Sequence, residues 1–240
     1  MLVLIDFPST FGLRSLSPFG YKAEVLLALA GLDYSKQAPE EALLPHGKVP
    51  VLKDGDRLIP DSSLIQQHLE QHHGLDADRS LTAYEMATAE AFRRMAEEHL
   101  RWCLVYSRWI EPANEAVMRD KVLGFLPAPA RAGILAEVRE TVGQALYHQG
   151  LGRHAPEAIY EFGRRDLDAI AAVLDDKPFF LADRPTTIDA TLAGLLINIL
   201  CPELQSPLQR HAAAIPAFSA YVRRVEETVF GAAAMLPEAA

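Results

Sequence analysis

The feature that most constrains the fold is a hairpin followed directly by a capped helix, within residues 46–64. Two short apolar runs, Val51-Leu52 and Leu58-Ile59, flank Asp54-Gly55, a strong signal for a tight turn between antiparallel strands. Asp61-Ser62-Ser63 then precedes an apolar helical pattern, so a hydroxyl stands where a helix should begin. We therefore expect a hairpin and a helix N-terminus next to each other.

Pro50 opens the first strand of this hairpin. Proline has no N–H and is confined to strand starts and edges, so the backbone groups of Val49 are free to pair with a peptide ligand. The N-terminus of the following helix carries a partial positive charge that suits a carboxylate. On the residues alone, an ordinary hairpin and an ordinary capped helix would also explain this pattern.

The residues before the hairpin predict an α/β domain. Leu2 to Phe7 has the composition of a buried strand, and Ser17-Pro18 is typical of a helix start, with Gly31 placed to end that helix. Tyr34 to Ala38 is a second candidate strand. With the hairpin, these elements make a mixed four-stranded sheet in the thioredoxin arrangement, over residues 1–75.

The remainder of the chain is helical in pattern. Residues 76–80 read as a polar linker, and Leu81 to Ile110 contains neither proline nor glycine, which predicts one long helix. Further helices are expected within residues 112–124, 129–149, 156–174, 187–200 and 216–230. We therefore expect an all-α C-terminal domain over residues 81–240.

Two motifs carry a resemblance to a known family. Lys48-Val49-Pro50 followed by Asp61-Ser62 resembles the glutathione site of the glutathione transferases, whose fold is a thioredoxin-like domain followed by an all-α domain. The resemblance implies a cis bond at Val49-Pro50. It also implies that Lys48, Val49, Pro50, Asp61 and Ser62 bind glutathione, with Val49 pairing with its cysteinyl unit and Asp61-Ser62 holding its γ-glutamyl end.

Later segments extend the resemblance. Phe180 to Asp189 is similar to the family segment in which a hydroxyl, here Thr186, caps a buried helix and an aspartate three residues on answers it. Residues 15–19 and 150–154 resemble the branch that contains failed axon connections and the metaxins. Members of that branch often carry cysteine where this chain has Gly20, so thiol chemistry there, and with it a glutathione-dependent reductase, is disfavoured.

Ser17 is the leading candidate for a catalytic residue. It matches the position where serine-type family members place the hydroxyl that binds the glutathione sulfur, and Tyr21 and Ser9 are weaker candidates. The alternative is that Ser17 only caps its helix. Lys48, His46 and Arg14 are local cations that could meet a glutathione carboxylate, or could be ordinary solvated side chains.

Three aromatic residues, Trp102, Tyr106 and Trp109, lie at i, i+4 and i+7 and so share one helix face. They are candidates for a substrate pocket wall, and a plain core stripe is the alternative. Arg153 and His154 follow two glycines in an expected loop, and the sequence suggests no chemical role for them.

Composition and spacing narrow the partners. A formal charge of −9 disfavours nucleic acid or an anionic membrane surface. The first residues lack a signal-peptide pattern and the longest apolar run is too short to span a bilayer, so a cytoplasmic protein is expected. No metal is expected, because Cys103 and Cys201 lack ligand spacing and His72-His73 point to different sides with no third ligand following.

The sequence thus predicts a transferase that joins the glutathione thiolate, with glutathione as co-substrate, to a small electrophile. The family suggests a homodimer. The alternative is a non-catalytic binding or scaffold protein of the failed-axon-connections and metaxin type, which keeps the fold without turnover.

Overall fold

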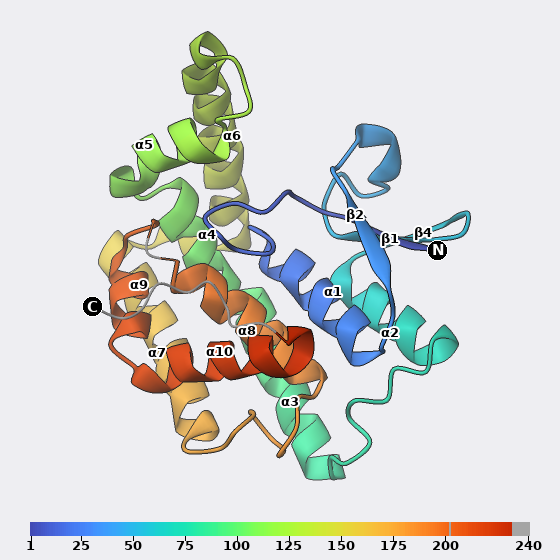
Figure 1. Cartoon of the computed structure of the whole chain (residues 1–240). Coiled ribbons are helices and arrows are strands. Elements are labelled where there is room, and N and C mark those ends of the chain that lie inside the picture. Colours follow the sequence, from blue (N-terminus) through green and yellow to red (C-terminus); the bar gives the residue numbers. More distant parts are fainter. Residues whose placement is uncertain (202, 232–240) are drawn as a thin grey trace.

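A four-stranded sheet with the order β2-β1-β3-β4 organises the first part of the chain (Figure 1). The computed structural model describes residues 1–201 and 203–231. β1 pairs in parallel with β2 and antiparallel with β3, which pairs antiparallel with β4. The strands are β1 (Leu2–Ile5), β2 (Tyr34–Gln37), β3 (Val51–Asp54) and β4 (Arg57–Pro60). The mixed sheet is as predicted, although β1 stops short of Phe7, which is exposed beside Pro8.

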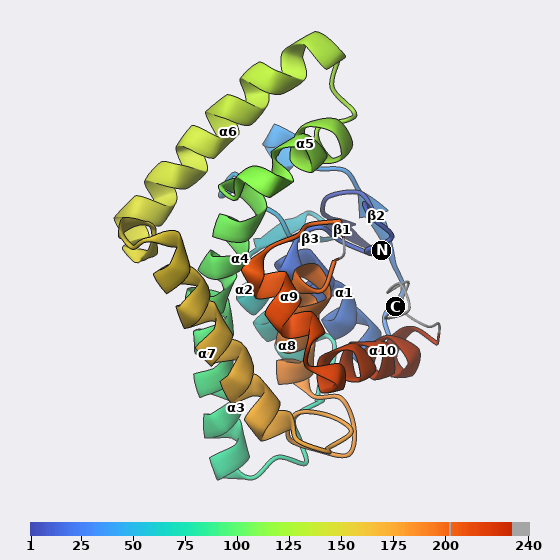
Figure 2. The ribbon, with the colours of Figure 1, turned by 90° about the vertical axis from the view of Figure 1, so that its left-hand side faces the viewer.

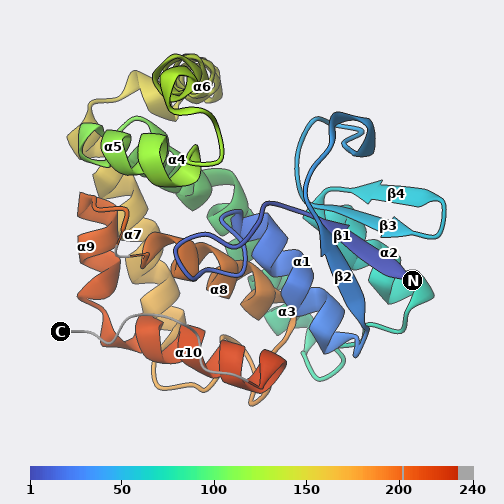
Figure 3. The ribbon, with the colours of Figure 1, turned by 45° about the horizontal axis from the view of Figure 1, so that its top comes forward.

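Two helices pack beside this sheet, α1 (Pro18–Leu29) and α2 (Ser62–His72), and a short turn η1 (Glu41–Leu43) precedes the hairpin. Figure 3 shows α1 between the strands and α8. Ser17 caps α1, because its hydroxyl oxygen accepts from the backbone N–H of Gly20 at 3.3 Å. The predicted cap of α1 is therefore confirmed.

The second part of the chain is helical (Figure 2). Its elements are α3 (Ala83–Met95), η2 (Ala96–Leu100), α4 (Arg101–Trp109), η3 (Pro112–Asn114), α5 (Glu115–Val117), η4 (Met118–Val122), α6 (Ala128–Gln149), η5 (Leu151–Arg153), α7 (Pro156–Leu174), α8 (Thr187–Ile199), α9 (Pro207–Ala213) and α10 (Pro216–Phe230). Across the described residues, no helix combines the length and apolarity needed to cross a membrane.

Three details differ from the sequence prediction. The long helix expected from residue 81 to 110 contains a π-helical segment, η2, between α3 and α4. The helix expected within residues 112–124 is divided into the short segments η3, α5 and η4. The short helix α9 was not predicted, because two helical turns with only Leu208 and Ala212 buried leave little periodic signal.

α8 is the centre of the helical part, and each of its residues is buried. Its start is fixed by Asp189, whose carboxylate accepts from the backbone N–H of Thr186 at 2.8 Å and its hydroxyl at 2.9 Å. The same carboxylate accepts from the Phe180 N–H at 2.9 Å and the Tyr221 hydroxyl at 2.7 Å. The predicted pairing of Thr186 with Asp189 is confirmed, and Asp189 also ties α10 to α8.

α1 joins the two parts of the chain, since it packs closely on α8. Gly194 of α8 leaves no room for a side chain there: a Cβ atom would lie 2.5 Å from the carbonyl oxygen of Pro18. A buried ion pair reinforces the contact, with Lys22 Nζ 2.7 Å from Glu97 Oε1, which also accepts from the Thr191 hydroxyl at 3.0 Å. Residues of α1, η2 and α8 are thereby held in one network.

Candidate functional site

A cleft of about 560 Å³ lies where the sheet part meets α3, η2 and α4. We call it the polar cleft. Its lining includes all five residues predicted to bind glutathione, Lys48, Val49, Pro50, Asp61 and Ser62. His46, one of the predicted cations, lines it as well. The hairpin and the start of α2 therefore come together in one concave site.

The backbone of Val49 and Pro50 forms one wall of the polar cleft. The Val49-Pro50 bond is cis, as the resemblance implied. β3 begins only at Val51, and within the described ranges the backbone groups of Val49 take part in no strand pairing. They remain available to an extended peptide, which is the pairing that an edge offers.

The N-terminus of α2 is part of the same wall, and one prediction about it needs correction. Asp61, not Ser62, is the N-cap, with its carboxylate accepting from the Ser63 N–H at 2.7 Å. Asp61 also has a φ of 71°, a strained conformation that costs about 1–3 kcal/mol and tends to occur at ligand sites. Ser62 is the first helical residue and is 3% exposed, and its hydroxyl has no hydrogen-bond partner among the described residues.

Three arginines from the helical part complete the cleft, namely Arg93, Arg94 and Arg101. Arg93 pairs with Glu90 at 2.6 Å and with Glu97 at 3.1 Å, so its charge is already balanced. Arg101 has no carboxylate within ion-pair distance in the described part of the chain, and it lies 4.0 Å over the Trp102 ring. Burial lowers the pKa of Arg101. It is therefore the cation in this wall best able to take a new anion.

The sequence analysis missed these arginines, because their only signal was a basic helix turn that surface helices commonly carry. Arg14, which was considered as a cation for glutathione, is elsewhere: it pairs with Glu226 at 3.3 Å and lies 3.7 Å over the Phe230 ring. Lys48 lines the cleft and is exposed.

A second and smaller hollow of about 180 Å³ adjoins the polar cleft, and we call it the apolar hollow. Ser17 lines it, together with Phe7, Leu16, Pro18, Leu104, Val105, Arg108 and Trp109. Phe19 and Arg101 line both spaces and so mark the boundary between them. Ser17 is thus placed beside the polar cleft and not within its wall.

The loop that carries Ser17 is held by buried polar contacts. Arg108 donates to the carbonyl oxygen of Leu16 at 2.6 Å and to Asn198 Oδ1 at 2.8 Å. Burial lowers the pKa of the Arg108 guanidinium to about 10, so it is charged at neutral pH. The Ser17 hydroxyl accepts from Gly20, which leaves its own O–H to donate. Capping and binding a thiolate therefore do not compete for one proton.

The aromatic stripe is divided. Trp109 lines the apolar hollow, whereas Trp102 and Tyr106 line neither space. Tyr106 packs edge-on against Tyr160 of α7, with ring centroids 5.7 Å apart. The hollow is lined by residues 101, 104, 105, 108 and 109, a face about 100° away from Trp102 and Tyr106. The proposal of one three-residue pocket wall is therefore not what the structure shows.

The weaker candidates, Tyr21 and Ser9, line neither space. Tyr21 is fully buried, with its ring edge-on to Phe230, and burial raises the pKa of its hydroxyl. Ser9 donates to the carbonyl oxygen of Leu13 at 2.6 Å in the loop after β1. Arg153 and His154 make local contacts with Tyr147 and Phe162 at the α6–α7 connection.

One argument from the sequence does not hold. His73 does have further potential ligands beside it, because the hairpin brings Asp54 to it and α2 brings His68. Cys103 is buried as predicted, and burial raises the pKa of its thiol to about 12.

A thioredoxin-like sheet followed by a helical part, with a polar cleft at their junction, defines the glutathione transferase fold class. Family models of the glutathione S-transferase N-terminal and C-terminal domains match residues 18–114 and 163–225. The isoprene-epoxide–glutathione S-transferase of Rhodococcus sp. (strain AD45) is 32% identical, over 83% of this chain and 87% of its own. The chain belongs to the glutathione S-transferase superfamily.

The branch predicted from residues 15–19 and 150–154 is also found among the relatives. Failed axon connections of Drosophila melanogaster is 29% identical over 96% of this chain, which spans 58% of that protein's length, and metaxins match as well. A solved glutathione S-transferase from Methylobacterium radiotolerans, in complex with glutathione sulfonate, covers 100% of this chain at 17% identity, with 97% of its own chain aligned and a TM-score of 0.64. This last likeness confirms the fold class.

Proposed function

We propose that this protein joins the thiolate of glutathione to a small electrophile. The observation that carries the proposal is the polar cleft, which is lined by the backbone of Val49, by Ser62 at the start of α2 and by Arg101. A tripeptide with two carboxylates needs backbone partners, an anion site at a helix N-terminus and a cation. All three are present around one space.

The apolar hollow supports the second half of the proposal. It adjoins the cleft across Phe19 and Arg101, and about 180 Å³ corresponds to roughly six water volumes, so it suits a small molecule. A glutathione sulfur directed across this boundary would meet the Ser17 hydroxyl. The thiol proton leaves to solvent, the sulfur lone pair forms a bond to the electrophilic carbon, and the bond from that carbon to its leaving oxygen or halide breaks.

The name of the Rhodococcus relative specifies an epoxide as its substrate. A small epoxide is therefore a reasonable class of electrophile for this chain, because opening of the strained ring by sulfur gives an alkoxide that takes up one proton. Arg101 lines both spaces, and in this proposal its guanidinium stabilises the developing negative charge.

The second candidate is a scaffold or binding protein without turnover. The similarity to failed axon connections over 96% of this chain, and to the metaxins, favours it. Such a protein could retain the cleft and lack chemistry.

The proposal also includes a homodimer and a cytoplasmic location. Light scattering after gel filtration would test the homodimer, and cell fractionation would test the location.

Calorimetric titration with glutathione, followed by turnover assays, separates these functions. The transferase predicts saturable binding of one glutathione per chain, and conjugate formation with a small epoxide or a generic aryl halide. Binding without turnover on either electrophile class would favour the scaffold. No binding would remove the transferase altogether.

A further inference from the structure

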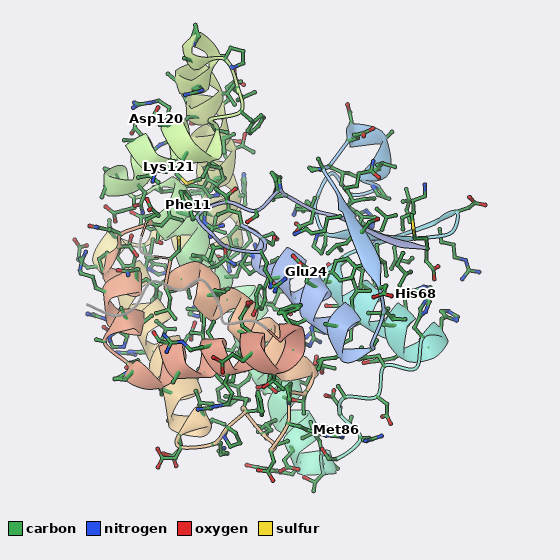
Figure 4. All side chains as sticks on the ribbon, viewed as in Figure 1. Phe11, Glu24, His68, Met86, Asp120 and Lys121 are labelled. Atoms are coloured by element: carbon green, nitrogen blue, oxygen red, sulfur yellow. The ribbon has the colours of Figure 1, made fainter. Side chains whose placement is uncertain are left out.

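A cluster of imidazole and carboxylate groups lies on the far side of the sheet part from the helical part. Asp54 Oδ2 is 2.9 Å from His68 Nε2 and 2.7 Å from His73 Nε2. Asp54 ends β3, His68 belongs to the last turn but one of α2, and His73 follows α2 directly. Figure 4 labels His68 on α2, at the side turned away from the helical part.

We propose that Asp54, His68 and His73 bind a divalent cation of the zinc class. The three ligand atoms, one from each residue, lie within 4.8 Å of one another. Ligands at ~2.0–2.1 Å around a tetrahedral ion lie about 3.4 Å apart, so rearrangements on the order of 1 Å bring all three onto one ion. Two imidazoles and one carboxylate are a donor set that zinc accepts, whereas magnesium and calcium prefer oxygen ligands.

The surroundings favour a cation at this place. The cluster is at the C-terminal end of α2, where the last carbonyl groups give the helix its partial negative charge. The side chains are 29% exposed for Asp54, 10% for His68 and 22% for His73, so the ligands are shielded but reachable.

Binding needs a simple exchange of protons. Each imidazole donates its Nε2 proton to Asp54 in the hydrogen-bonded arrangement, since one carboxylate oxygen can only accept. When the ion binds, each ring moves its proton to Nδ1 through solvent and offers the Nε2 lone pair to the metal, with no net change in protonation. Because a protonated imidazole cannot bind metal, affinity should fall on acidification.

The site would leave coordination positions open to solvent. A hollow of about 500 Å³ lies over the cluster and is bounded also by Asp56, Arg57 and His72. The opposite charges of Asp56 and Arg57 at this rim offset each other. His72 is exposed, and its ring centroid is 4.7 Å from that of His68, so it is a neighbour of the ion and not part of the three-ligand set.

The position of the cluster suggests a structural role. β3 and α2 each have one end in the polar cleft, near Val49 and at Ser62, and the other end in the cluster. An ion bound there would fasten the hairpin to α2, about 16 Å along the helix from the cleft. This inference is independent of the proposed transferase activity.

Zinc titration of the untagged full chain, stripped with a chelator and kept free of thiols, tests the proposal. We expect one Zn²⁺ per chain by calorimetry, visible absorption bands when Co²⁺ replaces it, and a rise in Tm of roughly 5–10 °C at zinc concentrations 100-fold above Kd. Mg²⁺ at the same concentration should give no rise. Absence of Zn²⁺ binding by the native chain would overturn the proposal.

Variants identify the ligands. His68→Gln, His73→Gln and Asp54→Asn should each weaken zinc binding by more than the ~10–100-fold that loss of an outer-shell partner costs. His211→Gln is the matched control, because His211 forms a similar pair with Asp168 at 2.7 Å but has no third ligand among the described residues. Far-ultraviolet circular dichroism checks that each variant folds. Folded His68→Gln and His73→Gln variants with unchanged zinc affinity would contradict the assignment.

Discussion

The polar cleft and the apolar hollow share a boundary at Phe19 and Arg101, yet they are built in different ways. One wall of the cleft is formed by Lys48-Val49-Pro50 and the start of α2. This wall comes from one continuous stretch, residues 48–62, whose turn and cap signals are local. The hollow is assembled from the loop before α1 and from one face of α4. The proposed binding wall was therefore visible in a motif, whereas the proposed reaction space depends on how two distant segments pack.

The largest expected effect concerns Gly20 in the first turn of α1, directly after the residues of α1 that line the hollow. A Cβ atom on Gly20 would lie 2.1–2.4 Å from the carboxylate of Asp6, which is 1% exposed. Gly20→Ala should therefore lower the free energy of unfolding by roughly 3 kcal/mol. Gly133→Ala in α6, where a Cβ meets nothing within 4 Å, is the control and should be stabilising. Urea denaturation measures both.

The double variant Gly20→Ala with Asp6→Ala sharpens this test, because removing the carboxylate makes room for the methyl group. The double variant should lose less free energy of unfolding than the two single variants lose in sum. Strict additivity would mean that the contact between Asp6 and Gly20 is not what excludes a side chain.

The next largest expected effect is on the affinity of the polar cleft for glutathione. Ser62→Ala removes an unpartnered hydroxyl at an anion site, and hydrogen bonds to charged groups contribute about 1.5–3 kcal/mol, so the Kd for glutathione should rise tenfold or more. Because Asp61 is the cap, stability should change little. Ser35→Ala on β2 is the control. An unchanged Kd for Ser62→Ala would remove Ser62 from the binding site.

The buried carboxyl of Asp6, just before Phe7 of the hollow, gives the stability of the protein a pH dependence. Burial raises the pKa of Asp6 from 3.8 to about 6, so the folded state holds this proton more tightly than the unfolded state. Stability from this group is present below pH 4 and is lost as the pH rises through 6, by roughly 2 kcal/mol. Asp6→Asn should abolish that loss. Parallel stability profiles of the two proteins from pH 4 to 8 would contradict the assignment.

The smallest expected effect is on KM for the electrophile, and it distinguishes the apolar hollow from the polar cleft that is proposed to bind glutathione. Trp109→Ala enlarges the apolar hollow and should raise KM for the electrophile about fivefold, or ~1 kcal/mol, with the glutathione Kd unchanged. Tyr106→Ala should change neither value, because Tyr106 packs against Tyr160 and lines neither space. If Tyr106→Ala has the larger effect on KM, the face of α4 has been assigned incorrectly.

The fold could be predicted from local signals, because the turn at Asp54-Gly55, the caps at Ser17 and Thr186 and the apolar periods each act within a few residues. The wall of the cleft formed by residues 48–62 could be predicted for the same reason, because its turn and cap signals are local. Arg101 could not be identified, since its role depends on the direction in which α4 faces. The spacing of Trp102, Tyr106 and Trp109 indicates a shared helix face. The packing of α4 turns the neighbouring face toward the hollow, so that only Trp109 of the three lines it.

The cluster at Asp54 shows the same limit. His68 and His73 are five residues apart, which is not a helical ligand spacing, and His73 reaches the carboxylate only because α2 has ended at His72. Asp54 comes from the hairpin, and its position beside α2 is a tertiary contact. Sequence spacing alone could not bring these three side chains together.

The central claim is that glutathione in the polar cleft directs its sulfur to Ser17 at the edge of the hollow. A thiol of pKa near 8.5 needs about 2.7 kcal/mol to fall by two units, and a helix N-terminus supplies only ~0.3–1 kcal/mol. The Ser17 hydroxyl, free to donate, can supply ~1.5–3 kcal/mol. Ser17→Ala should therefore raise the pKa of bound glutathione by about one unit or more.

The measurement is the ultraviolet absorbance of the thiolate in the glutathione complex as a function of pH, for the native chain and Ser17→Ala. Ser206→Ala is the matched control, since Ser206 caps α9 in the same way, accepting from the Gln209 N–H at 3.1 Å, but lines neither space. We expect a titration curve shifted to higher pH for Ser17→Ala alone. Coincident curves for Ser17→Ala and the native chain would show that Ser17 only caps α1 and would contradict the account.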